Sequence, residues 1–260
     1  IANMELRPTF LSIVDESALG DAVVRKLNNH KVNTEYIQSA PNGMGTWLAV
    51  FDHEGDVVAS VSKRPDLTPI GNILDEQGDE IFKDADSIDL DKDIMKKIFQ
   101  YAEKYNKDVY ALVSNMTIAV ERRDFLRKTS CFVCNQQEAG ILFSEDYENK
   151  TPQEMADILA DRIKSARISR MVVTMGGEGA VYADSHGNRG FVPALKVDVV
   201  DTTGAGDAFF AGVCMGLTYG KTMAEACSIG TRLASTVITT SENICPRFMP
   251  EEFGIKPVQK

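Results

Sequence analysis

The segment Asp-Thr-Thr-Gly-Ala-Gly-Asp at residues 201–207 constrains this chain more than any other. An apolar run at 197–200 precedes it, and a second apolar run at 208–217 follows it. This order predicts a strand, a glycine turn and the start of a helix. Because the first N–H groups of a helix lack partners within the helix, and its dipole is positive there, the turn is expected to form an anion site.

An acidic side chain accompanies this predicted anion site. Asp207 falls in the first turn of the predicted helix, where it is placed to take a proton from a hydroxyl. The amides would meanwhile stabilise the charge that moves onto a phosphoryl group. The alternative is an ordinary glycine turn whose acid caps the helix. The residues singled out are Asp207 as the base and, as the anion hole, Gly204, Ala205 and Gly206.

This seven-residue run resembles the C-terminal signature of the PfkB, or ribokinase-like, carbohydrate and nucleoside kinases. It is not a Walker A loop, because no Gly-Lys-Ser/Thr follows the glycines. The resemblance implies an α/β fold with a ribokinase-like three-layer α/β/α body, a mainly parallel sheet and a small β-strand lid. It also implies phosphorylation of a primary hydroxyl on a sugar or nucleoside, with ATP and Mg²⁺, under a lid that excludes water.

Composition is typical of a soluble globular protein, with 43% apolar and 25% charged residues among 260. The 38 acidic and 28 basic residues give a formal net charge of -10. This charge argues against general binding to nucleic acids or anionic membranes. No apolar stretch reaches the roughly 18 residues of a membrane helix, and no secretory signal is visible. We therefore expect a cytoplasmic protein that acts on a small molecule, with no nucleic-acid or membrane partner.

Five cysteines are present, and the pair Cys131 and Cys134 has CxxC spacing. The pair lies inside an apparent strand, with no second pair and no histidine cluster to complete a zinc site. The cysteines expected to be buried free thiols are Cys131, Cys134, Cys214 and Cys227. The three histidines, His30, His53 and His186, are isolated in polar turns and are expected to be solvated.

Strand and helix signals alternate through the C-terminal two thirds of the chain. Thr151 and Thr222 each begin a capping box with a Glu three residues later, and Pro152 adds a first-turn proline. Helices separated by short apolar runs imply βαβ units and a mainly parallel sheet. Strands are predicted at 109–113, 131–134 and 171–174, and helices from Asp91, from Thr151 and from Thr222 to about Thr239.

The N-terminal third has a different pattern. β-rich runs at 47–51 and 57–61 flank a turn at 52–56, which predicts a hairpin. Strands without intervening helices suggest a small β lid, contributed by about 36–62 and the first strand region, within a single domain spanning 1–260. The acidic stretch 70–84 is expected to be an irregular return connection. The resemblance also implies a homodimer contact through the lid, as in several family members.

Asn135 and Glu138 follow the predicted strand 131–134. Ligands gather at the carboxyl ends of strands in open α/β sheets. The segment resembles the family's Asn-x-x-Glu motif, which implies that Asn135 helps place the nucleotide phosphates and Glu138 the hydration shell of Mg²⁺. The alternative is a helix cap formed by an Asn and Glu pair.

Thr174, Gly176 and Gly179 follow the predicted strand 171–174 and resemble the family's Thr-x-Gly-x-x-Gly turn. The resemblance implies contact with the nucleotide phosphates, since glycines permit close backbone approach and Thr174 offers a hydroxyl. The alternative is a hairpin turn.

Four residues of the N-terminal third are candidates for contact with the phosphate acceptor. Asn3 and Glu5 lie on the first strand-like run, where the family often has Asn-x-Asp. Glu5 departs from that pattern by one methylene group. The alternative to a binding role for Glu5 is that it faces solvent from the strand. Gly45 and Thr46 resemble the Thr/Gly stretch that faces the sugar from the lid, and their alternative is a loop before a hairpin.

Asn243 follows the last long helix, where the family has residues around the adenine and a monovalent cation. The resemblance implies that Asp201 and Thr203 belong to the same cation loop, so K⁺ is a further expected cofactor.

The acceptor is predicted from softer matches. Residues 45–50 followed by 52–56, residues 191–195, and residues 241–243 occur in the order found in pseudouridine kinases. Pseudouridine is the predicted acceptor, and the sugars used by ribokinase- or fructokinase-type enzymes are the alternative. Because a glycine-rich segment usual in the family is absent near the N-terminus, we also expect that residues of the natural protein are missing from this chain.

Two other functional classes compete with the kinase interpretation. A non-catalytic PfkB-like sugar sensor would use the same pocket, but a pure binder has no need of the base Asp207. A Rossmann-type dinucleotide enzyme would place Gly-x-Gly-x-x-Gly after the first strand, and nothing in residues 1–40 fits that motif.

Overall fold

The computed structural model describes residues 1–51, 57–63, 65–89, 95–112 and 123–256. The expected hairpin turn at 52–56, with His53, and the predicted helix start at Asp91 lie outside these residues. The chain divides into two compact units. The first comprises Ile1, Asn3–Glu5 and Ile81–Lys260, and the second comprises Ala2 and Leu6–Glu80.

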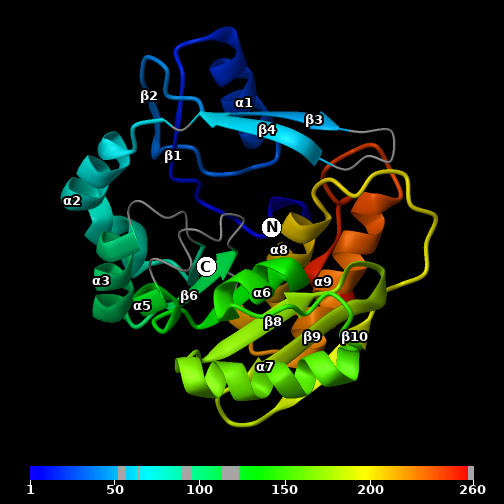
Figure 1. Cartoon of the computed structure of the whole chain (residues 1–260). Coiled ribbons are helices and arrows are strands. Elements are labelled where there is room, and N and C mark those ends of the chain that lie inside the picture. Colours follow the sequence, from blue (N-terminus) through cyan, green and yellow to red (C-terminus); the bar gives the residue numbers. More distant parts are fainter. Residues whose placement is uncertain (52–56, 64, 90–94, 113–122, 257–260) are drawn as a thin grey trace. The chain divides into compact units, whose positions relative to one another are not determined.

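A six-stranded sheet forms the centre of the first unit, in the order β10-β9-β8-β7-β6-β5 (Figure 1). Neighbouring strands from β5 to β8 are parallel, whereas β9 and β10 pair antiparallel at one edge. This confirms the predicted, mainly parallel sheet and all three predicted strands. The strands are β5 (Ser87–Asp89), β6 (Asp108–Leu112), β7 (Cys131–Asn135), β8 (Arg170–Thr174), β9 (Gly179–Asp184) and β10 (Arg189–Pro193).

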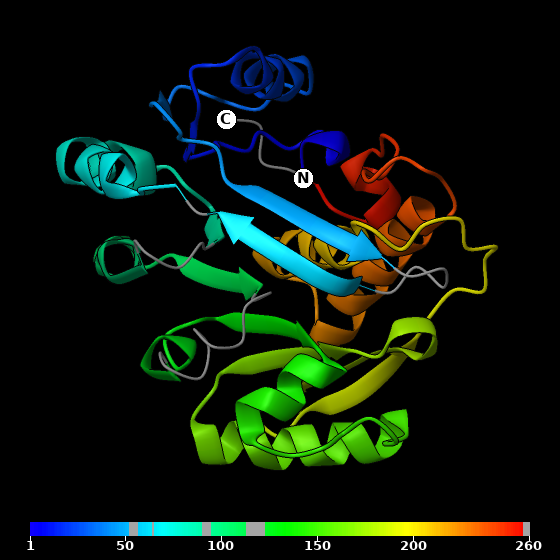
Figure 2. The same ribbon diagram turned by 45° about the horizontal axis from the view of Figure 1, so that its top comes forward.

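Helices cover both faces of this sheet. Figures 1 and 2 show α7 on one face and the pair α8 and α9 on the other. The helices of the unit are α3 (Met95–Tyr105), α5 (Arg123–Leu126), α6 (Gln136–Phe143), α7 (Pro152–Ala166), α8 (Ala205–Thr218) and α9 (Met223–Ile238), with 3₁₀ turns η1 (Ala2–Met4), η3 (Gly176–Glu178) and η4 (Pro250–Phe253). The three-layer α/β/α body is therefore confirmed.

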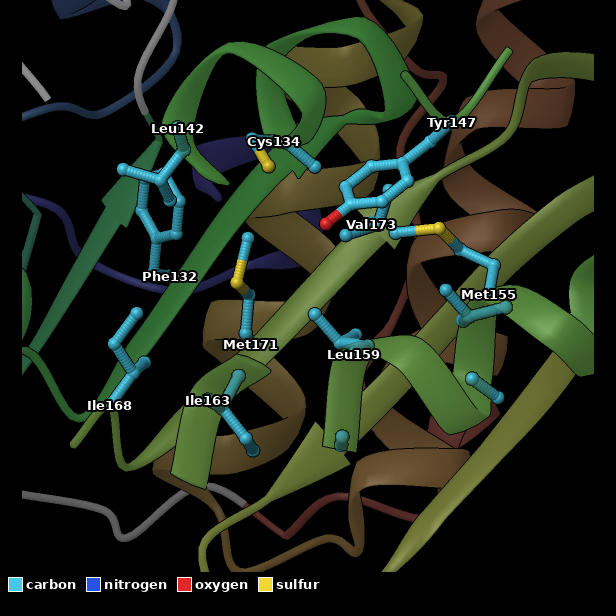
Figure 3. Close-up of a cluster of buried hydrophobic side chains, with 14 of the residues drawn as sticks. Phe132, Cys134, Leu142, Tyr147, Met155, Leu159, Ile163, Ile168, Met171 and Val173 are labelled. Atoms are coloured by element: carbon cyan, nitrogen blue, oxygen red, sulfur yellow. The ribbon is translucent and has the colours of Figure 1, made fainter. Parts of the chain in front are cut away.

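Alternation along the strands builds the two cores. On β7, Phe132 and Cys134 pack toward α6 and α7, whereas Cys131 and Val133 pack toward α8 and α9. Figure 3 shows the first of these cores, in which Met155 of α7 lies beside Val173 of β8 and Tyr147. Successive side chains of a strand point to opposite faces, so the CxxC cysteines cannot meet. Both are free and buried, as predicted, and burial raises the pKa of the Cys131 thiol to about 12.

The helix starts predicted at Thr151 and Thr222 are confirmed by their caps. The Thr151 hydroxyl accepts the Glu154 amide while the Glu154 carboxylate accepts the Thr151 amide. Thr222 and Glu225 form the same capping box at the start of α9. Each box satisfies two backbone donors that the first turn of a helix leaves unpaired.

The second unit contains a parallel pair of strands, a hairpin and two helices. β1 (Ser12–Val14) and β2 (Ile37–Ser39) are parallel and joined through α1 (Ala18–Asn29). The predicted hairpin is confirmed as β3 (Thr46–Phe51) paired antiparallel with β4 (Val57–Lys63). Most of α2 (Thr68–Lys83) completes the unit.

Two expectations for this part of the chain are wrong. The N-terminal third does contain a helix between strands, because the Ser17 side chain accepts the amides of Leu19 and Gly20 and caps α1. The stretch 70–84 is mostly helical rather than irregular. Asp66 accepts the Thr68 amide at 2.9 Å, at the start of α2. The apolar spacing of its buried residues is helical: Ile70, Ile73 and Leu74.

Glycines allow α8 and α9 to pack unusually closely. A Cβ added at Gly212 would lie 2.6 Å from the Gly230 Cα, and one at Gly216 would lie 2.8 Å from the Ala226 Cβ. Both distances are too short for ordinary contact, so these two positions of α8 exclude side chains. Among the described residues, no helix is both long enough and apolar enough to cross a lipid bilayer.

We predict that Gly212→Ala destabilises the protein by about 1–3 kcal/mol, the usual cost of forcing a methyl group into a packed interface. Gly206→Ala in the same helix is the control, since a Cβ there would have nothing within 4 Å. Urea unfolding of both variants provides the measurement. Equal midpoints for Gly212→Ala and the parent protein would contradict the close packing.

Candidate active site

The N-terminus of α8 lies at the carboxyl edge of the sheet. Thr218, the last residue of α8, hydrogen-bonds with the Tyr110 hydroxyl. That hydroxyl lies 3.4 Å from the Asp108 carboxylate at the start of β6. α8 therefore runs opposite to β6, and its 14 residues extend over about 21 Å, more than the roughly 17 Å of a five-residue strand. Ligands of open α/β sheets bind at this edge.

The start of α8 presents unpaired backbone donors. Gly204 is the N-cap, in a left-handed conformation with φ of 83°, and no side chain caps the helix there. Ala205 donates its amide to the Thr202 carbonyl at 3.2 Å. The amides of Gly204, Gly206 and Asp207 have no acceptor among the described residues. Three donors thus face outward at the positive end of a helix.

Two further features keep this helix start open. A Cβ at Gly206 would meet nothing within 4 Å. Asp207 is exposed in the same turn. An exposed carboxylate therefore lies beside the unpaired amides, whereas the amide of Ala205, which was expected in the anion hole, is occupied by the Thr202 carbonyl.

The run 197–200 is not a strand, contrary to the expectation. No strand is assigned there, and Val199 and Val200 are largely exposed. The Val200 amide donates to the Ile238 carbonyl at the end of α9, at 2.7 Å. The apolar run alone was the basis for predicting a buried strand. A strand also needs a neighbouring strand to pair with, and among the described residues this segment has none.

Asn243 packs against the start of α8. A Cβ at Gly204 would lie 2.6 Å from the Asn243 carbonyl oxygen. The tertiary structure thus brings Asn243 to the predicted anion site from 39 positions along the chain, as the residue numbers show. The cap Gly204 is required both by its backbone conformation and by this close approach.

Asn135 and Glu138 form the capping box of α6. The Asn135 side chain accepts the Glu138 amide at 2.8 Å, and the Glu138 carboxylate accepts the Asn135 amide at 2.7 Å. Burial raises the pKa of the Glu138 carboxyl, and the bond from Asn135 opposes this rise. The local contacts of Asn135 and Glu138 are therefore those of a helix cap, the alternative that the sequence left open. A cap at the carboxyl end of β7 is also compatible with a ligand-binding role.

Thr174 lies beside Asn135, because the two residues are partners in the parallel pairing of β7 and β8. The Thr174 hydroxyl is 3.5 Å from the Cys134 carbonyl. The turn that follows joins β8 to antiparallel β9, so it is also a hairpin connection. Gly179, with φ of 128°, would collide through a Cβ with the Val192 carbonyl, so the turn itself requires it. Gly176 has a φ of 55° and no such neighbour.

The expectation that Asn3 and Glu5 lie on a strand is wrong. Asn3 belongs to the 3₁₀ turn η1, and Glu5 has a left-handed φ of 56°. Arg247 forms an ion pair with Glu5, and the Asn3 side chain donates to the Cys245 carbonyl at 2.7 Å. Sequence reasoning missed Arg247, since nothing local indicates a partner 242 positions away.

The remaining candidates are placed within their own units. Gly45 and Thr46 lie in the second unit, with Thr46 at the first position of β3. In the first unit, the Asp201 carboxylate accepts the Thr203 amide at 2.8 Å. This bond holds the pKa of Asp201 below its ordinary value. Asp201 and Thr203 thus form one local turn immediately before the anion site.

Comparison with known proteins assigns the chain to a family. A sequence model described as pfkB family carbohydrate kinase matches residues 1–247. The chain belongs to the PfkB family. Members are ATP-dependent phosphotransferases, so this is a sugar or nucleoside kinase of the PfkB family. The ribokinase-like fold expected from the sequence is confirmed.

Two known kinases are similar to this chain in sequence, and one solved structure is similar to it in fold. A guanosine-inosine kinase from Exiguobacterium acetylicum is 31% identical over 240 residues, covering 90% of this chain and 78% of the relative. The pseudouridine kinase of Escherichia coli is 24% identical, covering 83% and 69%. The structure of Arabidopsis thaliana ribokinase complexed with ribose and ATP superposes with a TM-score of 0.79 at 18% identity, covering 97% and 83%.

The two capping boxes of α6 and α7 allow the cap and ligand roles of Asn135 to be separated. We predict that Asn135→Ala and the control Thr151→Ala each lower the free energy of unfolding by about 1 kcal/mol. Only Asn135→Ala should also lower turnover, because Asn135 ends β7 at the carboxyl edge, whereas Thr151 follows α6 and a loop rather than a strand. Chemical unfolding and initial rates of ADP release measure the two effects. Equal activity of the two variants would leave Asn135 with the cap role alone.

Proposed function

We propose that this chain phosphorylates the 5′-hydroxyl of a nucleoside at the N-terminus of α8. The observation that carries the proposal is the exposed Asp207 carboxylate beside unpaired amides at the carboxyl edge of the sheet. Asp207 takes the proton of the acceptor hydroxyl. The amides of Gly204, Gly206 and Asp207 hold the oxygens of the transferring phosphoryl group, where negative charge is concentrated. Asn3 and Glu5 of the first unit, and Gly45 and Thr46 of the second, remain the proposed acceptor-binding residues.

Gly206 supports this assignment independently. A glycine inside a helix costs about 1 kcal/mol relative to alanine. Here neither a left-handed backbone nor a neighbouring atom requires it, since a Cβ would meet nothing within 4 Å. Close approach of a ligand to the backbone gives a physical reason for the missing side chain.

The donor nucleotide is proposed to bind along the same edge of the sheet. Asn135, Thr174 and Gly176 lie at the carboxyl ends of β7 and β8, and Asn243 lies against Gly204. Gly179 supports the same turn by its backbone conformation.

Glu138 fits a water-mediated contact with Mg²⁺. Its carboxylate is committed to the cap through Oε2, and two carboxylate oxygens give it capacity for a further bond. No group of three or more metal-ligating side chains occurs in the described parts of the chain. Bound Mg²⁺ would therefore neutralise phosphate charge while held mainly by phosphate oxygens and water. We also retain Asp201 and Thr203 as proposed ligands of a monovalent cation such as K⁺.

A purine nucleoside is the acceptor we propose first. The support is the guanosine-inosine kinase, which is 31% identical over 90% of this chain. Pseudouridine, predicted from the order of short sequence matches, is supported by a relative at 24% identity. Selectivity between them depends on a few hydrogen bonds to the base, because an acceptor lacking one leaves a buried polar group of the protein unpaired.

The test is ADP release from Mg-ATP with guanosine, inosine, pseudouridine, ribose and fructose, against a reaction without acceptor. We expect turnover with guanosine or inosine to exceed that with the free sugars. Turnover confined to ribose or fructose would overturn the nucleoside assignment. Repeating the best reaction in KCl and in NaCl tests the monovalent cation.

We predict that Asp207→Asn lowers kcat by about 10²- to 10⁴-fold, the usual contribution of a positioned general base. ATP binding should remain close to that of the parent protein, because the backbone amides are unchanged. Asp198→Asn, also exposed and nine residues upstream, is the charge-matched control. Steady-state kinetics and equilibrium ATP binding provide the readouts. A kcat for Asp207→Asn near the parent value would remove Asp207 from the role of base.

The hairpin of the second unit also supports the expected homodimer contact. Leu48 and Val61 are directly paired across β3 and β4, and their side chains are 68% and 70% exposed. Val50 follows on the same face at 59% exposure. An apolar strip on a two-stranded sheet favours an interaction partner, and we propose a second copy of this chain.

We predict that Leu48→Lys shifts the protein from dimer to monomer, because the lysine places a charge within the apolar strip. Leu19→Lys on α1 is the control, since Leu19 is similarly exposed, at 63%, in the same unit but outside the strip. Sedimentation velocity over a range of concentrations measures both. A parent protein that stays monomeric throughout would contradict the proposed contact.

A further inference from the structure

Arg232 of α9 makes four contacts with the segment that follows α9. Its guanidinium lies 2.9 Å from the Glu252 carboxylate and 3.3 Å from the Glu252 carbonyl. The same group lies over the rings of Phe248 and Phe253, 5.0 Å and 4.8 Å from their centroids. The two rings pack edge to face, with centroids 5.5 Å apart. We call these four residues the Arg232 clamp.

The clamp fixes the C-terminal segment on α9. The segment and the helix lie side by side in Figures 1 and 2. The Met249 amide donates to one oxygen of the Glu252 carboxylate at 2.9 Å, and Arg232 donates to the other, so Glu252 joins the start of its own turn to α9. Ile255, directly beyond the turn, is 1% exposed. The segment from Phe248 to Ile255 is thus anchored by charge, ring packing and burial together.

The clamped segment continues directly to the proposed active site. The Phe248 amide donates to the Asn3 carbonyl, and the Asn3 side chain donates to the Cys245 carbonyl, both at 2.7 Å. Two residues before Cys245, the backbone of Asn243 rests against Gly204, the cap of α8. Ring contact, hydrogen bonds and close packing along one short segment therefore join Arg232 to the anion site.

We propose that Arg232 is a positioning residue, which holds residues 243–248 in place against the start of α8. The inference rests on the proposed function of that helix start. Gly204 has no side chain that could hold Asn243 in place. The position of Asn243 therefore depends on the clamp, which anchors the segment that carries it. Asn243 is a proposed nucleotide-binding residue, so loss of the clamp should act mainly on binding of the nucleotide and less on the chemical step.

The role in positioning can be separated from a role in stability. The Arg232 and Glu252 side chains are 41% and 42% exposed, and ion pairs of such exposure stabilise proteins little. The pair Arg189 and Asp157, at 49% and 51%, has similar geometry on another part of the same unit. Arg189→Met is therefore a matched control for Arg232→Met.

The experiment is steady-state kinetics of Arg232→Met, Arg232→Lys and Arg189→Met, with the unfolding midpoint of each. For Arg232→Met we expect KM for ATP to rise by about tenfold to a hundredfold, the effect of misplacing one hydrogen-bonding group of the nucleotide site, with kcat changed less. Arg232→Lys should recover part of this loss, since an ammonium keeps the charge but not the planar contacts with both rings and Glu252. Arg189→Met should have the KM of the parent protein.

Two results would overturn the inference. One is a parent-like KM for ATP in folded Arg232→Met, and the other is an equal rise in KM for Arg189→Met. If Arg232→Met does not fold, Phe248→Leu takes its place, because it removes one ring of the clamp and keeps an apolar side chain. The KM for ATP of Phe248→Leu then tests the inference in the same way. Failure of the proposed function is distinguishable, because the parent protein would then phosphorylate none of the acceptors and Asp207→Asn would change nothing.

Discussion

The close packing of α8 on α9 is the contact on which the rest of the site depends. Gly212 and Gly216 let the two backbones approach to distances that exclude any side chain. With its far end tied to the start of β6 through Tyr110 and Thr218, α8 has little freedom to slide or tilt. Its first turn is thereby held at the carboxyl edge of the sheet. A helix fixed in this way presents its amides in a constant direction, which is what stabilisation of a charged transition state requires.

Several separate parts of the chain meet the α8 N-terminus or share its sheet edge. The parallel register of β7 and β8 places Asn135 beside Thr174. Asn243 reaches Gly204 on the segment that returns from α9. Asn135 and Thr174 lie together because parallel strands all end at the same edge, whereas Asn243 arrives from the end of α9. The same geometry explains why a cap such as Asn135 can serve both its helix and a ligand.

The accuracy of the sequence predictions depended on whether the decisive interaction is local. The helices starting at Thr151 and Thr222 were predicted correctly, since their caps involve residues three apart. α2 was missed because the Gly71 and Gly78 positions weaken its helical pattern, although Asp66 provides a start signal. The run at 197–200 was wrongly predicted as a strand, because none of the described strands pairs with it. The contacts of Asn3 and Glu5 span 242 positions and had no local signal.

The sequence by itself determined the family, the α/β class and the glycine turn with its acid, because each depends on residues close together in the chain. It also determined that Cys131 and Cys134 are buried free thiols, through their place in a strand. Only the tertiary structure decided which residues surround that turn. Asn243 lies against Gly204, and Arg232 anchors the segment that carries it, through packing between elements far apart in sequence. Such packing depends on how the side chains of helices and strands fit together in the folded protein. The spacing of residues along the sequence does not encode this fit.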